Sequence, residues 1–155
     1  MKKTVSLVLV LAMIAVVWIG FGSAASASEA RAMNNTEKAL ALINTFATGD
    51  TDTARDLLAD DYIQHNLAYG TGADAFIGSV EYLASADVKT TVNNIRAFED
   101  GDKVFLQTIY NFAGAGEQVA FDIFRFDENG KIAEHWDVME TIADPSTWQN
   151  QNGKF

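Results

Sequence analysis

Two strand-like runs of the chain flank the dipeptide Asn129-Gly130. Such a dipeptide supplies the positive φ at both central positions that a type I′ turn requires, so the two runs are predicted to form a β-hairpin. Asp122 shares its strand parity with Phe124 and Phe126, so one face of the first run carries a carboxylate and two large rings. An ionised carboxylate is costly to bury beside rings unless it is paired or used in a site. Alternation alone leaves open whether this face is buried or exposed.

The second half of the chain has the period of β-strands. Apolar residues alternate in four runs, and the short turns between the runs contain Gly. Turns of this kind join antiparallel neighbours, so the pattern predicts a four-stranded antiparallel meander. The predicted strands are 88–99, 103–113, 117–127 and 131–142.

Helical periodicity governs the region before these strands. Asn34 and Glu37 have the spacing of a capping box, and apolar residues repeat at helical spacing from there to Gly49. The elements predicted after that first helix are a short helix from Asp50 or Thr51 through Ala59, a short strand at 62–66 and a third helix at 73–84. Three helices followed by a meander predict an α+β fold in which the helices cross the concave face of a curved antiparallel sheet. A pocket between these two layers is the expected site for a small molecule.

Composition excludes several classes of partner and site. The formal net charge is −10 with a pI near 4.4, which argues against nucleic acid and against anionic membrane surfaces. The chain has no Cys and two His, so it forms no disulfide and a structural zinc site is not expected. A metal site built from His65, His135 and Asp122 would need three separate elements, and no local spacing supports it. No cofactor or metal is therefore predicted.

Residues 1–27 have the pattern of a bacterial signal peptide. Lys2 and Lys3 precede a long apolar run, and the triplet Ala25-Ser26-Ala27 is a small-residue cleavage site. This predicts a secreted or periplasmic protein without membrane contact after cleavage. The alternative is an uncleaved N-terminal membrane anchor, because the apolar run approaches the length of a span. The predicted organisation is a signal peptide at 1–27, a linker at 28–35, one domain at 36–145 and a C-terminal tail at 146–155.

The chain resembles the SnoaL-like polyketide cyclase family of the nuclear transport factor 2-like superfamily over residues 36–142. The residues that carry the resemblance are Tyr62-Ile63-Gln64-His65-Asn66, Phe76, Asp122-Ile123-Phe124-Arg125-Phe126 and Gly130-Lys131-Ile132-Ala133-Glu134-His135-Trp136-Asp137-Val138. The resemblance implies a cone-shaped barrel with a deep pocket. It also implies that Asp122, on the strand before the Gly-Lys-Ile turn, is the acid/base of an aldol-type ring closure. Relatives often carry His on the preceding strand, whereas this chain has Gln107 and Thr108 there.

Asp122 is the predicted general base, since burial beside rings would make its carboxylate a stronger base for an α-proton. The structural alternative is an ion pair with Arg125 or a Lys, although Arg125 has the opposite strand parity. The resemblance implies that His65 lies near the pocket mouth, where it could polarise a carbonyl or simply bind loop backbone. Either His135 or Trp136 faces the pocket, because adjacent strand residues point to opposite faces.

The remaining predicted contacts come from the strand that precedes Asp122. Gln107 and Thr108 could form hydrogen bonds to a substrate, and Thr108 or Tyr110 could present a hydroxyl to an oxyanion. Two functions remain open on this basis. One is a cofactor-independent lyase, isomerase or cyclase acting on a small apolar carbonyl compound; the other is an exported binding module that holds a small apolar ligand without catalysis.

A homodimer is also predicted. A meander has a convex face, and its large apolar residues cannot all point toward the helices. The residues that carry this expectation are Val92, Phe98, Ile109 and Ile123. Exposed apolar patches of this kind usually mark partner surfaces.

Overall fold

A computed structural model describes residues 31–155 of the chain. The predicted signal peptide and the first part of the linker lie outside the described residues. In the described part, no helix has both the length and the apolar character that crossing a membrane requires. The elements are α1 (Asn35–Thr48), α2 (Thr51–Leu57), β1 (Leu58–Gln64), α3 (Ala73–Ser85), β2 (Thr91–Asp100), β3 (Lys103–Asn111), β4 (Gln118–Phe126) and β5 (Ile132–Thr141).

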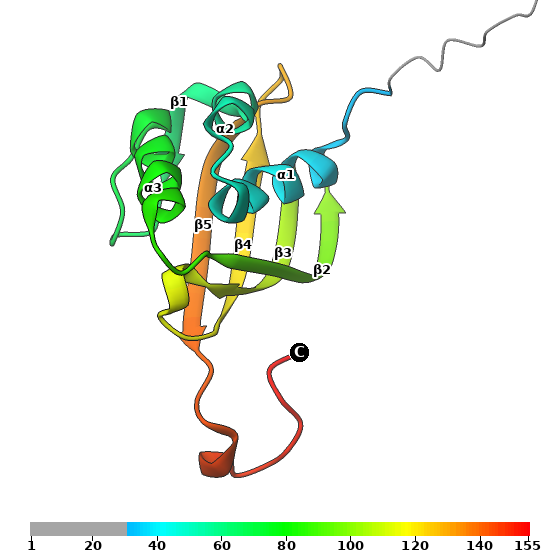
Figure 1. Cartoon of the computed structure of the whole chain (residues 1–155). Helices are drawn as coiled ribbons and strands as arrows, with labels where there is room; N and C mark the ends of the chain where they lie inside the picture. Colours follow the sequence, from blue (N-terminus) through cyan, green and yellow to red (C-terminus); the bar gives the residue numbers. More distant parts are fainter. Residues whose placement is uncertain (1–30) are drawn as a thin grey trace, which may run out of the picture. The chain divides into compact units, whose positions relative to one another are not determined.

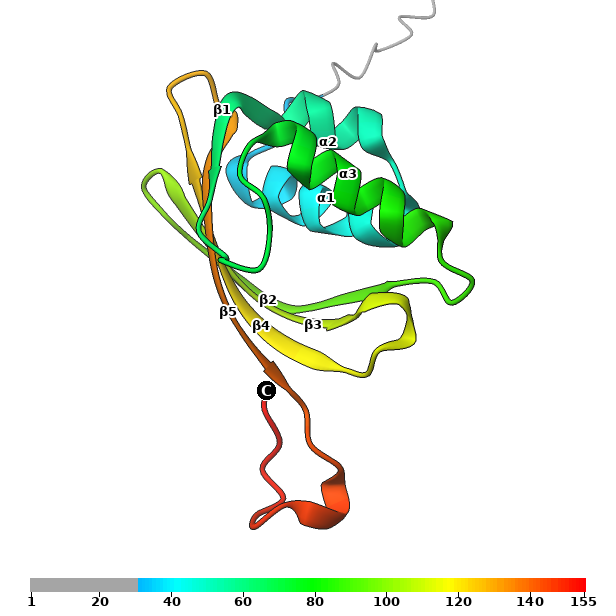
Figure 2. The ribbon, with the colours of Figure 1, turned by 90° about the vertical axis from the view of Figure 1, so that its left-hand side faces the viewer.

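The five strands form one mixed sheet in the order β1-β5-β4-β3-β2. Strands β2 to β5 make the predicted antiparallel meander, and β1 adds a parallel strand beside β5. The sheet is strongly curved and does not close, because β1 and β2 are its two edges. The three helices lie together on the concave side, and no α-helix of residues 31–155 lies on the other face of the sheet (Figures 1 and 2). The predicted α+β fold with three helices over a curved sheet is confirmed. The sheet is open and does not close into a barrel.

Helix α1 begins where the capping box predicts. The Asn34 side chain accepts a hydrogen bond from the backbone N–H of Glu37, and the Glu37 carboxylate accepts one from the backbone N–H of Asn34, both at 2.8 Å. Gly49 ends the helix in the left-handed conformation with φ 75°. The buried face of α1 presents Leu42 and Ile43 to the core. The packing of Leu42 and Ile43 fixes α1 as one wall of the space between the helices and the sheet.

The boundary between α2 and β1 lies earlier than predicted. Helix α2 ends at Leu57, not at Ala59, and β1 already begins at Leu58. The reason is tertiary pairing: Leu58 is in register with Ile132 of the parallel neighbour β5 and is buried. The local periodicity of the sequence cannot reveal this pairing, because the two strands are far apart along the chain.

The β4–β5 hairpin is confirmed, but its predicted turn type is wrong. The backbone N–H of Gly130 donates to the carbonyl of Asp127 at 3.0 Å, which places the turn one residue earlier. Gly130 has φ 70°, whereas Asn129 does not have a positive φ. A turn followed by a left-handed Gly is the three-residue hairpin connection, not type I′. The Asp127 carboxylate selects it by accepting from the backbone N–H groups of Asn129 and Lys131.

A bulge in β2 decides which of its side chains face the helices. The register with β3 shifts between Asn94 and Arg96, so the inward set changes parity along the strand. Val92 packs against the core on the concave side, whereas Phe98 pairs with Phe105 on the other face and is 64% exposed.

Candidate functional site

A cavity of about 550 Å³ lies between α1, α3 and the curved sheet. Its walls are mainly aromatic and aliphatic. The Phe and Tyr residues of these walls are Phe46, Tyr69, Phe76, Tyr82, Tyr110, Phe112 and Phe124. Polar side chains gather on the sheet side, where Gln64, Asp122, His135 and Asp137 reach the lining. The cavity is therefore apolar with one polar end, which is the usual form of a small-molecule site.

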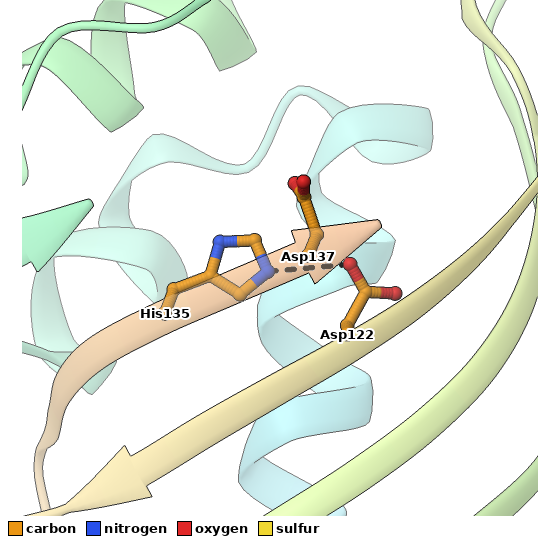
Figure 3. Close-up of side chains that lie close together, drawn as sticks. All are labelled: Asp122, His135 and Asp137. Atoms are coloured by element: carbon orange, nitrogen blue, oxygen red, sulfur yellow. Dashed lines mark hydrogen bonds and ion pairs between the residues drawn. The ribbon is translucent and has the colours of Figure 1, made fainter. Parts of the chain in front are cut away.

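Asp122 lies at this polar end and is 4% exposed. Its strand β4 pairs with β3 on one side and β5 on the other, so partners reach it from both neighbours. The Tyr110 hydroxyl donates to Asp122 Oδ2 at 3.0 Å, and His135 Nε2 lies 3.2 Å from Asp122 Oδ1 (Figure 3). The Asp122 side chain thus has a hydrogen-bond partner on each oxygen. Arg125 is not one of them, because it points to the other face of the sheet.

Tyr110 is held as a neutral donor. Burial raises the pKa of its hydroxyl well above the ordinary value, and the charge of Asp122 and the hydrogen bond to it act in the same direction. Thr108 is fully buried next to it and accepts a hydrogen bond from the Asn94 amide at 3.1 Å. Thr108 does not line the cavity, and its hydrogen-bond partner in the polar network is Asn94 on the neighbouring strand.

His135 enters the cavity from β5, and its ring stacks on Phe124 with 4.4 Å between ring centroids. Its Nδ1 atom lies 3.0 Å from Gln64 Nε2. Asp137, two residues further along β5, accepts two hydrogen bonds from the Asn66 amide, at 2.7 and 2.9 Å. The end of β1 and the segment that follows it therefore position both β5 side chains.

Asp122, His135 and Asp137 bring three potential cation-binding groups together. One donor atom from each lies within 4.8 Å of the others, and Asp122 is directly opposite Asp137 in the β4–β5 register. Figure 3 shows Asp122 reaching this cluster from β4, and His135 and Asp137 from β5. The three-residue metal set considered from the sequence is not assembled, because His65 lies elsewhere.

His65 and Trp136 form a separate cluster outside the cavity lining. Their rings stack with a centroid distance of 4.7 Å, and His65 Nε2 lies 2.8 Å from Glu134 Oε1. Arg125 Nε donates to Glu134 Oε2 at 2.6 Å. The hydrogen bond from His65, followed by that from Arg125, lowers the pKa of the Glu134 carboxyl. Of the two alternatives for this strand, His135 faces the cavity and Trp136 faces away.

Gln107 also lies outside the cavity lining. Its neighbours Leu106 and Thr108 face the helices, so Gln107 points to the other side of the sheet, where its amide donates to the Lys154 carbonyl at 2.9 Å. The C-terminal tail is held there a second time by Lys154 Nζ, which lies 2.6 Å from each carboxylate oxygen of Glu140. Gln107 thus contacts the tail.

Gln64, Asn66 and Asp137 belong to the site but are not among the residues that the sequence motifs predict for it. For Asp137 the signal was available, because it shares the strand parity of its near neighbour His135. Gln64 and Asn66 carry no such signal. Their role depends on the parallel pairing of β1 with β5, which no local pattern predicts.

The family model described as the SnoaL-like domain matches residues 39–135, and the chain belongs to this family. No curated protein matches the sequence at a significant level. Solved structures with the same fold include an NTF2-like protein of unknown function from Cytophaga hutchinsonii, with 16% identity and a TM-score of 0.61 over 72% of this chain and 94% of that one. An LEH-like epoxide hydrolase from M. tuberculosis has 19% identity and a TM-score of 0.60, over 68% and 82%. IdmH from Streptomyces antibioticus, named as a candidate polyketide cyclase, has 19% identity and a TM-score of 0.56, over 70% and 93%.

Proposed function

We propose that this protein is a cofactor-independent lyase, isomerase or cyclase that performs aldol-type acid/base chemistry on a small apolar carbonyl compound. The observation that carries the proposal is the position of Asp122: a buried carboxylate at the polar end of an otherwise apolar cavity. A base of this kind removes a proton from the carbon next to a carbonyl. Solved structures with the same fold are named as an LEH-like epoxide hydrolase and as a candidate polyketide cyclase, and these names support a catalytic function.

In the proposed step, the C–H bond next to the carbonyl breaks and the proton passes to an Asp122 oxygen. The negative charge moves from the carboxylate to the enolate oxygen. Tyr110 and His135 lie 3.0 and 3.2 Å from the two Asp122 oxygens, so their donor groups are beside the place where this charge develops. Once Asp122 is protonated, one of these donors can turn to the enolate oxygen and stabilise it.

The charge of the cavity restricts the substrate. Among the described residues, the cavity lining includes the carboxylates of Asp122 and Asp137 but no Lys or Arg. A carboxylate or phosphate on the substrate would be repelled and would lack a cationic partner. The volume of about 550 Å³ and the aromatic walls suit a neutral, largely apolar molecule.

The alternative function is a binding module that uses the same cavity without catalysis. The absence of a His on β3 and the hydrogen-bond partner on each Asp122 oxygen favour this alternative. Incubating the purified protein with simple ketones in deuterated water tests the choice. Catalysed deuterium uptake next to the carbonyl supports the enzyme, whereas a small apolar molecule that co-purifies, found by mass spectrometry without any uptake, supports the binding module.

We further propose a homodimer formed through the sheet face opposite the helices. Phe98, Phe105, Phe121 and Val138 are between 40% and 72% exposed, and their register places them on this one face. A patch of adjacent exposed rings is typical of a partner surface. Light scattering at micromolar concentration should give twice the monomer mass, and a clean monomer contradicts the proposal.

Export with removal of residues 1–27 is the corresponding proposal for localisation. It rests on Lys2, Lys3 and the Ala25-Ser26-Ala27 triplet. The intact mass of the protein recovered outside the cytoplasm should correspond to a chain that begins at or near Ser28. A full-length, membrane-bound product supports the anchor instead.

A further inference from the structure

Gln64 lies between the backbone after β1 and the imidazole of His135. Its Oε1 accepts a hydrogen bond from the backbone N–H of Asn66 at 2.9 Å. A backbone N–H can only donate, so this bond fixes which end of the Gln64 amide is the oxygen. The NH₂ group therefore faces the other way, 3.0 Å from His135 Nδ1 and 3.2 Å from the Tyr62 hydroxyl.

The orientation of this amide determines where the imidazole carries its proton. An amide NH₂ offers two N–H donors and accepts nothing, so His135 Nδ1 must accept and cannot itself be protonated. A neutral imidazole with a bare Nδ1 has its proton on Nε2. That atom lies 3.2 Å from Asp122 Oδ1, so the N–H points at the carboxylate.

We infer that Gln64 is a positioning residue, which holds His135 as the neutral Nε2–H tautomer and leaves Asp122 as the proton acceptor of the pair. Only the catalytic consequence of this inference rests on the proposed function. The tautomer is a property of the folded protein, whether or not the cavity performs chemistry.

Several titratable groups face the ring or the adjoining cavity and act on its charge. They are Tyr62 on β1, Tyr69 in the segment between β1 and α3, Tyr82 on α3, Tyr110 on β3, Asp122 on β4 and Asp137 on β5. Burial, ahead of the charges of Asp137 and Asp122, raises the pKa of Tyr62, so its hydroxyl remains neutral and can accept from Gln64.

The two carboxylates favour a positively charged ring. A second proton on Nδ1, however, would oppose the Gln64 NH₂ group. Relieving that conflict requires the amide to turn over and abandon the backbone N–H of Asn66. The contact from Gln64 therefore opposes the carboxylates and keeps the ring neutral.

The test is a long-range proton–nitrogen correlation spectrum of the ¹⁵N-labelled protein at neutral pH. The chain has only two histidines, so a His65→Gln variant assigns the remaining imidazole signals to His135. The expected spectrum shows an unprotonated Nδ1 and a protonated Nε2. A protonated Nδ1 in the unmodified protein overturns the inference.

Two variants of Gln64 separate positioning from mere packing. Gln64→Glu keeps the shape and the acceptor for Asn66 but places a carboxylate oxygen against Nδ1, so the Nδ1 signal should change to the protonated form. Gln64→Met keeps the length and removes the donor, while Asp122 still accepts from Nε2–H, so the Nδ1 signal should shift toward the protonated form. If either variant folds and keeps the original nitrogen pattern, Gln64 does not set the tautomer. Should Gln64→Glu fail to fold, the unmodified protein and Gln64→Met still decide.

The same variants connect the tautomer to the proposed chemistry. A charged His135 stabilises the Asp122 carboxylate and makes it a weaker base, so deuterium uptake by a ketone should fall by about tenfold or more in Gln64→Glu. Loss of the nitrogen pattern with unchanged uptake overturns the catalytic consequence. The expected nitrogen pattern in a protein without any uptake leaves the positioning role intact and contradicts the proposed function alone.

Discussion

Asp122→Asn should leave the fold as stable as before or make it slightly more stable. The substitution keeps the shape of the side chain and removes its charge. In the native site, a donor hydroxyl from Tyr110 and the imidazole N–H of His135 bond the two carboxylate oxygens. The new amide can keep both contacts, because its oxygen accepts from His135 and its NH₂ can donate to the Tyr110 hydroxyl once that hydroxyl rotates.

The magnitude follows from two opposing effects. A hydrogen bond to a charged group stabilises by about 1 kcal/mol more than a neutral one, so two such bonds lose about 2 kcal/mol. The oxygens of Asp122 and Asp137 lie within 4.8 Å, and two like charges at that distance repel by about 3 kcal/mol at an effective dielectric constant of about 20. Partial exposure of Asp137 reduces that figure. We therefore expect a change within about 1 kcal/mol of zero, equivalent to a few degrees in Tm.

Thermal unfolding of the unmodified protein, Asp122→Asn, Asp137→Asn and the double variant measures this balance. The double variant is the decisive control, because both single changes relieve the same repulsion. The stabilising contribution of the second change should therefore shrink once the first is present. A loss of more than about 2 kcal/mol in Asp122→Asn would show that Asp122 is a structural member of the network and refute the reasoning.

Three further changes test other parts of the account. Tyr110→Phe removes a donor from a buried carboxylate and should cost about 1.5–3 kcal/mol in denaturant unfolding; an unchanged midpoint contradicts the hydrogen bond to Asp122. Because the pKa of Glu134 is lowered in the folded protein, its ionised carboxylate stabilises the fold above pH 4.5, and this stabilisation is lost as the pH falls through the lowered pKa. Glu134→Gln should therefore flatten the acid side of the curve of stability against pH. An unaltered curve contradicts the pairing of Glu134 with His65 and Arg125. Asn34→Ala should cost about 1 kcal/mol through loss of the α1 cap, while Asn34→Asp should not, and equal effects of the two variants contradict the capping role.

Local patterns were sufficient for most of the fold. The capping box at Asn34 and the helical spacing that follows it describe interactions within one helix, and α1 begins and ends where they indicate. The meander followed from alternation and short Gly turns. The turn at Gly130 was predicted with the wrong geometry because the Asp127 carboxylate, outside the dipeptide, selects the connection.

The site was predictable only where strand parity determines it. Parity separated Asp122 from Arg125 and His135 from Trp136, although it did not say which set faces the helices. The hydrogen bonds around His135 could not be predicted from local sequence patterns, because Gln64 reaches His135 only through the parallel pairing of β1 with β5. His65 lies in the same short segment, yet its side chain pairs with Glu134 outside the cavity lining.

The measurement that tests the central claim most directly is deuterium uptake by a simple ketone in the presence of Asp122→Asn. The matched control is Asp102→Asn, the same chemical change at an exposed carboxylate that contacts Lys103. If Asp122 is the base, its variant should remain folded and bind ligand, and its uptake rate should fall by on the order of 10² or more, while Asp102→Asn keeps the original rate. A folded Asp122→Asn protein with the original uptake rate would contradict the account.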